Sequence, residues 1–144
     1  MQQLQLVAYG EPSDVIELNR VPEPALGQED VLVSMEAAPI NPSDFMLVRG
    51  IYHVRPAFPF PVGAEGVGRV IQTGSKVDGA LRGRRVLILP TYEQGTWADQ
   101  VVALEDDAVT SRTPYLLCSL FSTDDIQCFD SRELCELEDV LSHG

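Results

Sequence analysis

Glycine and proline interrupt the stretch from Ala38 to Gly74, and these constrained backbone positions most limit what the chain can fold into. A short helix is expected to begin at Asn41-Pro42, because asparagine is a good N-cap and proline is pre-organised for the first helical turn. It should end at Gly50. Three glycines between Val62 and Thr73 then predict a bent strand with close backbone contacts. Polar side chains accompany these positions, so we expect any chemistry of the protein here.

Short strands with turn residues between them make up the rest of the chain to about residue 104. Apolar and polar residues alternate in each of them, as in half-buried strands. The expected strands are residues 4–8 and 15–21, which should form a hairpin, followed by 30–38, 83–90 and 95–103. Together with one small helix, they predict a mainly β fold, either a β-barrel or a β-rich roll.

Length and charge limit the class of protein. A chain of 144 residues suits a single domain with a buried core. The net charge of −12 argues against nucleic acid and anionic membranes as partners, because both need clustered lysine and arginine. The N-terminus has no signal-peptide pattern, and no apolar run approaches the roughly 20 residues of a membrane-spanning helix. A cytoplasmic location is therefore expected, or a mitochondrial one if a targeting segment has been removed.

Composition and charge change after Val109. Residues 110–144 hold all three cysteines and carry two arginines against seven acidic residues, a net charge of −5. The cysteine spacing suits neither a disulfide framework nor a zinc knuckle, so free thiols are expected. Residues 130–141 predict a short amphipathic helix with Asp130 as its cap and Glu133 in capping-box position. A helix of this length is marginal in water, so the tail is expected to be helical or disordered.

Three motifs in a fixed order resemble a known family. They are Asn41-Pro-Ser-Asp44, Arg49-Gly50-Ile-Tyr52 and Gly63-Ala-Glu-Gly-Val-Gly68. Together they resemble the medium-chain dehydrogenase/reductase superfamily, and within it the zinc-independent branch of quinone oxidoreductases and 2-enoyl thioester reductases. The likeness covers Met1 to about Val109. It implies a GroES-like domain, a partly open β-barrel that forms the substrate side of an active-site cleft.

The resemblance also implies roles for two side chains. Tyr52 is expected to be catalytic, orienting the substrate carbonyl and helping to supply a proton while NADPH supplies the hydride. A phenol aimed at a developing enolate oxygen stabilises charge that appears only in the transition state. The alternative is a surface aromatic beside Pro56 and Phe58. Asn41 is expected to contact the nicotinamide amide or ribose, which is compatible with its capping the helix.

No metal site is expected. In zinc-dependent relatives a histidine stands at the position of Ala64, and a cysteine precedes the first helix, where this chain reads Ala38-Pro39-Ile40. His53 and His143 are the only histidines, and no cysteine precedes residue 118. The usual three nitrogen or sulfur ligands of a catalytic zinc therefore cannot be assembled in this domain.

The dinucleotide-binding fingerprint, G-x-G-x-x-G between a strand and a helix, is missing from the sequence. Family members continue into a Rossmann domain, but this chain departs from the family after Val109. We therefore expect residues 1–109 to form the substrate-side domain and 110–144 a divergent acidic tail, with the Rossmann domain absent. Full-length relatives would use NADPH, whereas this chain alone is expected to bind no coenzyme and to be inactive.

Two hypotheses about function follow. The first is a truncated domain of an NADPH-dependent reductase whose small-molecule substrate is a 2-enoyl thioester or a quinone. The second is a non-catalytic β-barrel that binds a protein through its open sheet edge or acidic tail, including a homodimer through the exposed edge. Both subfamilies place a tyrosine at the position of Tyr52, so the sequence does not separate the two substrates. The residues that choose between NADPH and NADH would lie in the absent domain.

Overall fold

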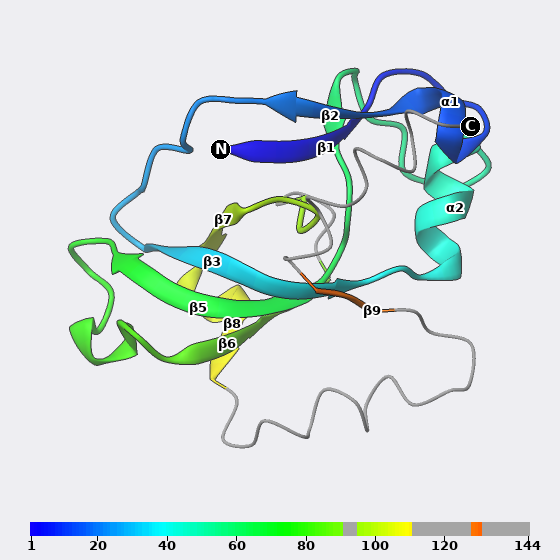
Figure 1. Cartoon of the computed structure of the whole chain (residues 1–144). Coiled ribbons are helices and arrows are strands. Elements are labelled where there is room, and N and C mark those ends of the chain that lie inside the picture. Colours follow the sequence, from blue (N-terminus) through cyan, green and yellow to red (C-terminus); the bar gives the residue numbers. More distant parts are fainter. Residues whose placement is uncertain (91–94, 111–127, 131–144) are drawn as a thin grey trace.

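The computed structural model describes residues 1–90, 95–110 and 128–130. These residues form two antiparallel sheets with short helices, so the predicted mainly β fold is confirmed (Figure 1). The helices are α1 (Pro12–Val15), α2 (Pro42–Val48) and the 3-10 turns η1 (Gly79–Leu81) and η2 (Glu105–Asp107). The strands are β1 (Gln2–Leu6), β2 (Ile16–Arg20), β3 (Asp30–Pro39), β4 (Phe60–Pro61), β5 (Gly66–Thr73), β6 (Arg85–Ile88), β7 (Gln100–Leu104), β8 (Ala108–Thr110) and β9 (Cys128–Asp130).

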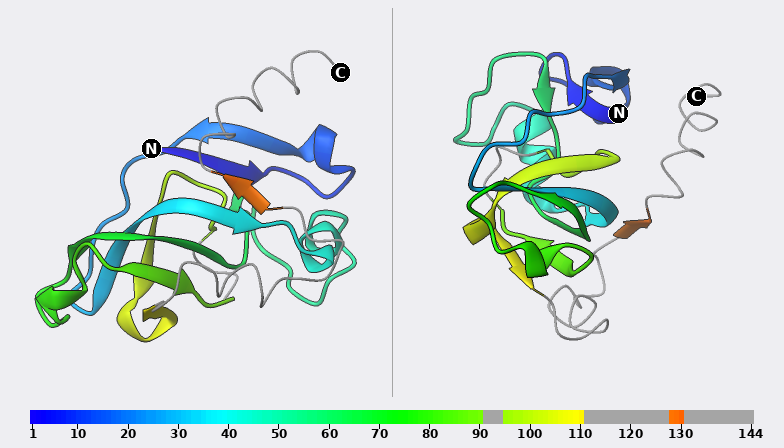
Figure 2. Two further views of the ribbon diagram at one scale, coloured as in Figure 1. Left: turned by 60° about the horizontal axis from the view of Figure 1, so that its bottom comes forward. Right: turned by 90° about the vertical axis from the view of Figure 1, so that its left-hand side faces the viewer.

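The smaller sheet has the strand order β2-β1-β4, and the larger has β7-β3-β5-β6-β8, with β9 also paired to β3. Strands β7 and β8 end this order without pairing to each other, so the described part is not a closed barrel. In Figure 2 the hairpin of β1 and β2 lies apart from the layer of β3, β5 and β6. No helix of the described residues is long and apolar enough to cross a membrane.

The first hairpin forms as expected, with β1 and β2 antiparallel from Gln2↔Arg20 to Leu6↔Ile16. The turn between them differs from the prediction, because Pro12–Val15 form one turn of helix, α1. Proline at the first helical position explains this, since its fixed φ angle suits the start of a helix. Two later strands are also shorter than expected. Strand β6 covers only Arg85–Ile88, and β7 begins at Gln100, after a non-strand segment.

Strands β3 and β5 approach each other closely, as the glycines of this segment predicted. A methyl group at Gly68 would meet the Ser34 carbonyl oxygen, and one at Gly66 would lie 2.9 Å from the Ala37 carbonyl oxygen. The register shifts between Met35 and Ala37, where β3 bulges opposite these glycines. The pairing of the two strands therefore requires residues without side chains at both positions.

Two apolar clusters form the core. The larger cluster lies along the larger sheet and consists of Val31, Val33, Met35, Val70, Val77, Val86, Ile88, Ala98, Val101, Ala103 and Ala108. The smaller cluster joins the first hairpin to α2 and consists of Leu4, Leu6, Val15, Val48 and Val62. Because full burial of a valine or leucine contributes about 1.5–3 kcal/mol, the smaller cluster is sufficient to fix α2 on the hairpin.

Strand β9 is the only part of the expected tail beyond Thr110 that the structure describes. Its backbone pairs antiparallel with the last residues of β3, from Ala37↔Asp130 to Pro39↔Cys128. Asp130 is thus the end of a strand, and the helix expected over 130–141 otherwise lies outside the described residues. Two of the cysteines, Cys118 and Cys135, lie outside them too. The division of the chain at residue 109 stays a prediction.

Replacing Gly68 with alanine should destabilise the fold, because the new methyl group would lie 2.5 Å from Val33 Cγ1 and also overlap the Ser34 carbonyl. We expect the free energy of unfolding in urea to fall by about 2–3 kcal/mol. Gly79→Ala is the matched control, since a methyl group there meets nothing within 4 Å. Equal stability of the two variants would show that β3 and β5 are not in this close register.

Candidate functional site

Asn41 and Asp44 meet at the N-terminus of α2, directly after β3. Asn41 is the N-cap, with an extended backbone (φ −96°, ψ 154°), and proline follows it in the first turn. The Asn41 backbone N–H donates to Asp44 Oδ2 at 2.7 Å. The Asp44 N–H donates in return to the Asn41 carbonyl oxygen at 3.0 Å. The helix start predicted at Asn41-Pro42 is therefore observed, and a carboxylate holds its backbone.

The side chain of Asn41 contacts a second carboxylate. Its Nδ2 donates to Glu65 Oε1 at 2.7 Å, across 24 residues of sequence. Glu65 precedes β5, and its carbonyl oxygen accepts a hydrogen bond from Thr96 Oγ1 at 2.7 Å. Thr96 is buried, with 1% of its surface exposed. Trp97 lies beside it and donates from Nε1 to the Pro39 carbonyl oxygen at 3.2 Å. These hydrogen bonds connect β3, α2, the start of β5 and the segment before β7 around Asn41.

Asp44 is a buried carboxylate with an unusual proton affinity. Only 2% of its surface is exposed, and Oδ1 has no hydrogen-bond partner. Burial raises the pKa of Asp44 to about 6, because the charged form loses hydration. The hydrogen bond from the Asn41 N–H lowers the pKa, and the negative charge of Glu65 raises it further. Asp44 therefore takes up a proton only slightly below neutral pH.

Tyr52 lies just beyond the C-terminal end of α2. The N–H groups of Ile51 and Tyr52 donate to the Met46 carbonyl oxygen at 3.0 and 3.1 Å, and Gly50 between them and the helix has a φ of 69°. The Tyr52 side chain is half-buried, and its ring centroid lies 4.2 Å from that of His53. It is thus neither fully exposed nor buried in apolar packing. Phe58, the neighbour expected from sequence, packs instead edge-on against Tyr9 at 4.8 Å.

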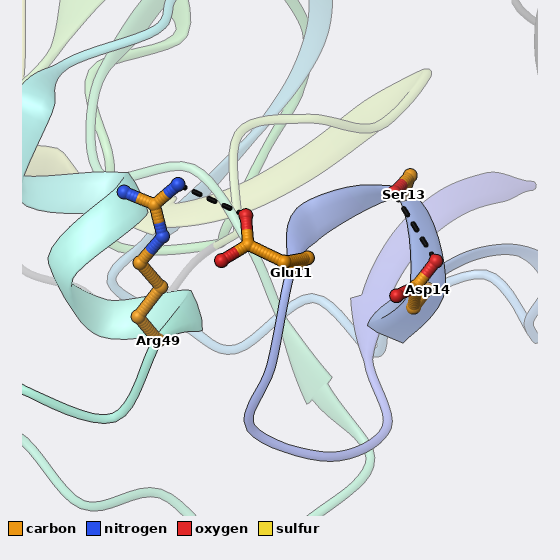
Figure 3. Close-up of polar contacts among 4 residues, drawn as sticks. All are labelled: Glu11, Ser13, Asp14 and Arg49. Atoms are coloured by element: carbon orange, nitrogen blue, oxygen red, sulfur yellow. Dashed lines mark hydrogen bonds and ion pairs between the residues drawn. The ribbon is translucent and has the colours of Figure 1, made fainter.

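An ion pair holds the C-terminal end of α2 to the first hairpin. Arg49 donates to Glu11 Oε2 at 2.9 Å, and Figure 3 shows the two side chains meeting between α2 and the loop before α1. The hydrogen bond from Arg49 and its charge lower the pKa of Glu11. Ser13 and Asp14, also drawn there, hydrogen bond to each other within α1 at 3.2 Å. Because the Arg49–Glu11 pair is exposed, it contributes little to stability, and the smaller core cluster holds α2 in place.

Comparisons with known proteins identify the family. The model of the alcohol dehydrogenase GroES-like domain matches residues 27–112. The chain belongs to this family. Its relatives belong to the medium-chain dehydrogenase/reductase superfamily, so the resemblance drawn from the motifs is confirmed.

Relatives of this GroES-like domain are oxidoreductases. The mitochondrial enoyl-[acyl-carrier-protein] reductase of Arabidopsis thaliana is 43% identical over 97 residues, which are 67% of this chain and 26% of that protein. A quinone oxidoreductase structure from Pseudomonas syringae superposes with a TM-score of 0.70 at 27% identity, over 78% of this chain and 34% of that one. The Escherichia coli quinone oxidoreductase in complex with NADPH shares the fold at 23% identity and a TM-score of 0.69, over 76% of this chain and 33% of that one. The chain spans about a quarter to a third of the length of these relatives.

The N-terminus of α2 would not by itself hold an NADPH molecule. The Asn41 carboxamide suits the polar end of a nicotinamide, but the N-terminus of α2 does not suit a pyrophosphate. Pro42 has no N–H there, and the Asp44 carboxylate already accepts the Asn41 N–H. Among the described residues, no three histidine, cysteine or acidic side chains gather where they would hold a metal ion.

The sequence identified Asn41 and Tyr52 as site residues, and the structure shows which side chains surround them. It places Asn41 between Asp44 and Glu65, and it anchors Tyr52 to the other end of α2. The contacts of Asp44, Glu65 and Thr96 were missed. Asp44 carried a signal, because it stands three residues after an N-cap in capping-box position. Thr96 carried none, since its contact with Glu65 depends on the folding of distant strands.

Asp44→Asn should change the pH dependence of stability. With its pKa at about 6, above the usual value of 3.8, Asp44 binds more protons in the folded chain than in the unfolded one between these pH values. The contribution of Asp44 to the free energy of unfolding therefore rises by about 2 kcal/mol as the pH falls from 7 to 4. The replacing carboxamide keeps an acceptor for the Asn41 N–H and does not titrate, so the variant should gain stability over the parent at pH 7.5 but not at pH 4.

Urea unfolding at pH 4, 5, 6 and 7.5 measures this difference for the parent and the variant. Asp14→Asn, at an exposed position on α1, is the control and should leave the profile unchanged. A parent and variant whose difference in unfolding free energy is constant from pH 4 to 7.5 would rule out a raised pKa at Asp44.

Proposed function

We propose that this chain is the substrate-side domain of an NADPH-dependent, zinc-independent oxidoreductase that reduces 2-enoyl thioesters, with quinones as the second substrate class. The observation that carries the proposal is the position of Tyr52. It follows α2 directly and is half-buried, in a chain 43% identical to a protein named as an enoyl reductase. The mitochondrial names of such relatives also support a mitochondrial location for the whole protein.

Tyr52 is proposed as the group that binds the substrate carbonyl. Its backbone N–H donates to the Met46 carbonyl oxygen, so the main chain from which the phenol extends is fixed relative to α2. A phenol hydroxyl donates a hydrogen bond to a thioester or quinone oxygen, and this bond strengthens as negative charge develops on that oxygen. Tyr52 thereby orients the acceptor and favours its charged form.

Asn41 is proposed as the contact to the nicotinamide end of the coenzyme. When bound, the coenzyme supplies the hydride. Its phosphates would have to be bound elsewhere than at the N-terminus of α2, which is blocked. No catalytic zinc is proposed, because Ala64 and Ile40 are not metal ligands. The contribution of this domain is then to place the substrate.

Tyr52→Phe should weaken the binding of a crotonyl thioester to the chain. Loss of one hydrogen bond of about 1 kcal/mol raises the dissociation constant about fivefold. Ligand-detected NMR with crotonyl-pantetheine measures this constant. Tyr9→Phe is the matched control, since Tyr9 is also a partly exposed tyrosine but packs against Phe58. An equal loss in both variants, or none in Tyr52→Phe, would contradict the assigned role.

The chain by itself should not oxidise NADPH in the presence of a crotonyl thioester or a quinone. The reason is that the described residues hold only one end of the coenzyme. Absorbance at the NADPH band measures turnover, and NADPH fluorescence measures binding. A rate that is proportional to chain concentration would overturn this expectation. Tyr52→Phe would then show whether the phenol contributes to that rate.

A second function, protein binding without catalysis, is favoured by the sheet edges. Strands β7 and β8 end the larger sheet and expose Leu104 and Val109, which are 52% and 45% accessible. Strand β9 pairs with the last residues of β3, so that edge accepts an added strand. A defined dimer mass by light scattering, without NADPH binding, would favour this function over the reductase. A monomer that binds thioester would reject it.

A further inference from the structure

The hydrogen bond between Asn41 and Glu65 determines what kind of ligand atom Asn41 is able to bind. Resting on the proposed function, we infer that Glu65 is a positioning residue that fixes the Asn41 carboxamide as a hydrogen-bond acceptor. The carboxamide oxygen is then directed to a donor on the ligand, such as the primary amide N–H of a nicotinamide or a ribose hydroxyl.

The orientation of the Asn41 carboxamide follows from the chemistry of its partner. A carboxylate only accepts hydrogen bonds, and of the two ends of an amide only the nitrogen donates. Asn41 Nδ2 must therefore face Glu65 Oε1, 2.7 Å away, and the opposite orientation would set two oxygens against each other. The usual ambiguity between amide nitrogen and oxygen does not arise beside an ionised carboxylate. The carboxamide oxygen lies at the other end of the group, where it faces the Asp44 N–H in the capping box and keeps a second lone pair for a ligand.

The main chain at Glu65 is held firmly enough to act in this way. Buried Thr96 accounts for two contacts, with Oγ1 donating to the Glu65 carbonyl oxygen at 2.7 Å and the N–H donating to the Gly63 carbonyl oxygen at 3.1 Å. Gly63 has a φ of 92°, and a methyl group there would lie 2.5 Å from the Trp97 ring. The turn before β5 is therefore fixed against the segment before β7, and the Glu65 carboxylate extends from a rigid support.

The main chain of Asn41 is fixed by a different carboxylate. Buried Asp44 accepts the Asn41 N–H at 2.7 Å, so one acid holds the backbone and a second holds the side chain. Rotation of the carboxamide would cost the charge-assisted bond to Glu65. A donor ligand gains a hydrogen bond at the carboxamide oxygen, whereas an acceptor ligand meets that oxygen with its own lone pairs.

This arrangement divides the polar recognition between two residues. Asn41 accepts from the coenzyme side, and Tyr52, whose hydroxyl donates, serves the substrate carbonyl. The two residues lie at opposite ends of α2, which keeps the donor and the acceptor apart.

The Asn41 side-chain NH₂ signals of a ¹⁵N-labelled chain test the positioning directly. With Glu65 in place, one proton should be shifted downfield and exchange with water at least about tenfold more slowly than in Glu65→Leu, which has no acceptor. Glu29→Leu is the matched control, because Glu29 is an exposed carboxylate that pairs with Lys76. Glu65→Asp keeps the charge and serves as a second variant if the leucine variant does not fold. Asn41 signals that are unchanged in Glu65→Leu would overturn the inference.

The acceptor role is tested with nicotinamide and N,N-dimethylnicotinamide, which differ in their amide N–H donors. Nicotinamide should bind the parent chain about five- to tenfold more tightly, and this preference should fall to about unity in Glu65→Leu. An absent preference in a parent chain with the expected NH₂ signals would refute the coenzyme contact of Asn41 and leave its orientation by Glu65 standing. A preference that persists in Glu65→Leu would refute the role of Glu65 and leave the coenzyme contact standing.

Discussion

The antiparallel pairing of β3 with β5 is the constraint on which the site depends. In an antiparallel pair the end of one strand lies beside the start of the other, and here Ala37 is opposite Val67. Beyond this pair, the chain of β3 continues to Asn41. On the facing strand, β5 begins directly after Glu65. A hydrogen bond across 24 residues of sequence is therefore a direct consequence of strand register. The glycines of β5 make that register accessible, because a side chain at Gly68 would meet the backbone of β3.

Local signals in the sequence were sufficient for the elements that depend on local physics. Alternation predicted the pairing of β1 with β2, Asn41-Pro42 predicted the start of α2, and Gly50 its end. The one-turn helix α1 was missed because a Pro-containing turn and a short helix begin alike. Strand β7 was predicted too early, since residues 95–99 alternate like a strand but use their backbone to bind β1, β3 and the turn before β5. The alternation of apolar and polar residues does not show which segment a backbone group will hydrogen bond to.

In the candidate site too, local motifs predicted some residues, whereas contacts between distant segments could not be predicted. Asn41 and Tyr52 were predicted from motif order, and the role of Asp44 could have been predicted from its spacing to the N-cap. Glu65 stood in the third motif, but its bond to Asn41 is a tertiary contact. Asp44 also illustrates a cost, because a carboxylate with 2% exposure and an unpaired oxygen is unfavourable when charged. The other carboxylate oxygen of Asp44 offsets part of this cost, because it accepts the backbone N–H of Asn41.

The carboxylate of Asp44 also makes the N-terminus of α2 unsuitable for binding phosphate. Helix N-termini bind phosphate when their N–H groups are free and no negative charge is near. At α2 the first position is proline, Asp44 accepts the N-cap N–H, and Glu65 adds a second negative charge nearby. The two acids that hold the backbone and the side chain of Asn41 therefore repel an anion. The N-terminus of α2 thus suits an uncharged ligand group better than a phosphate.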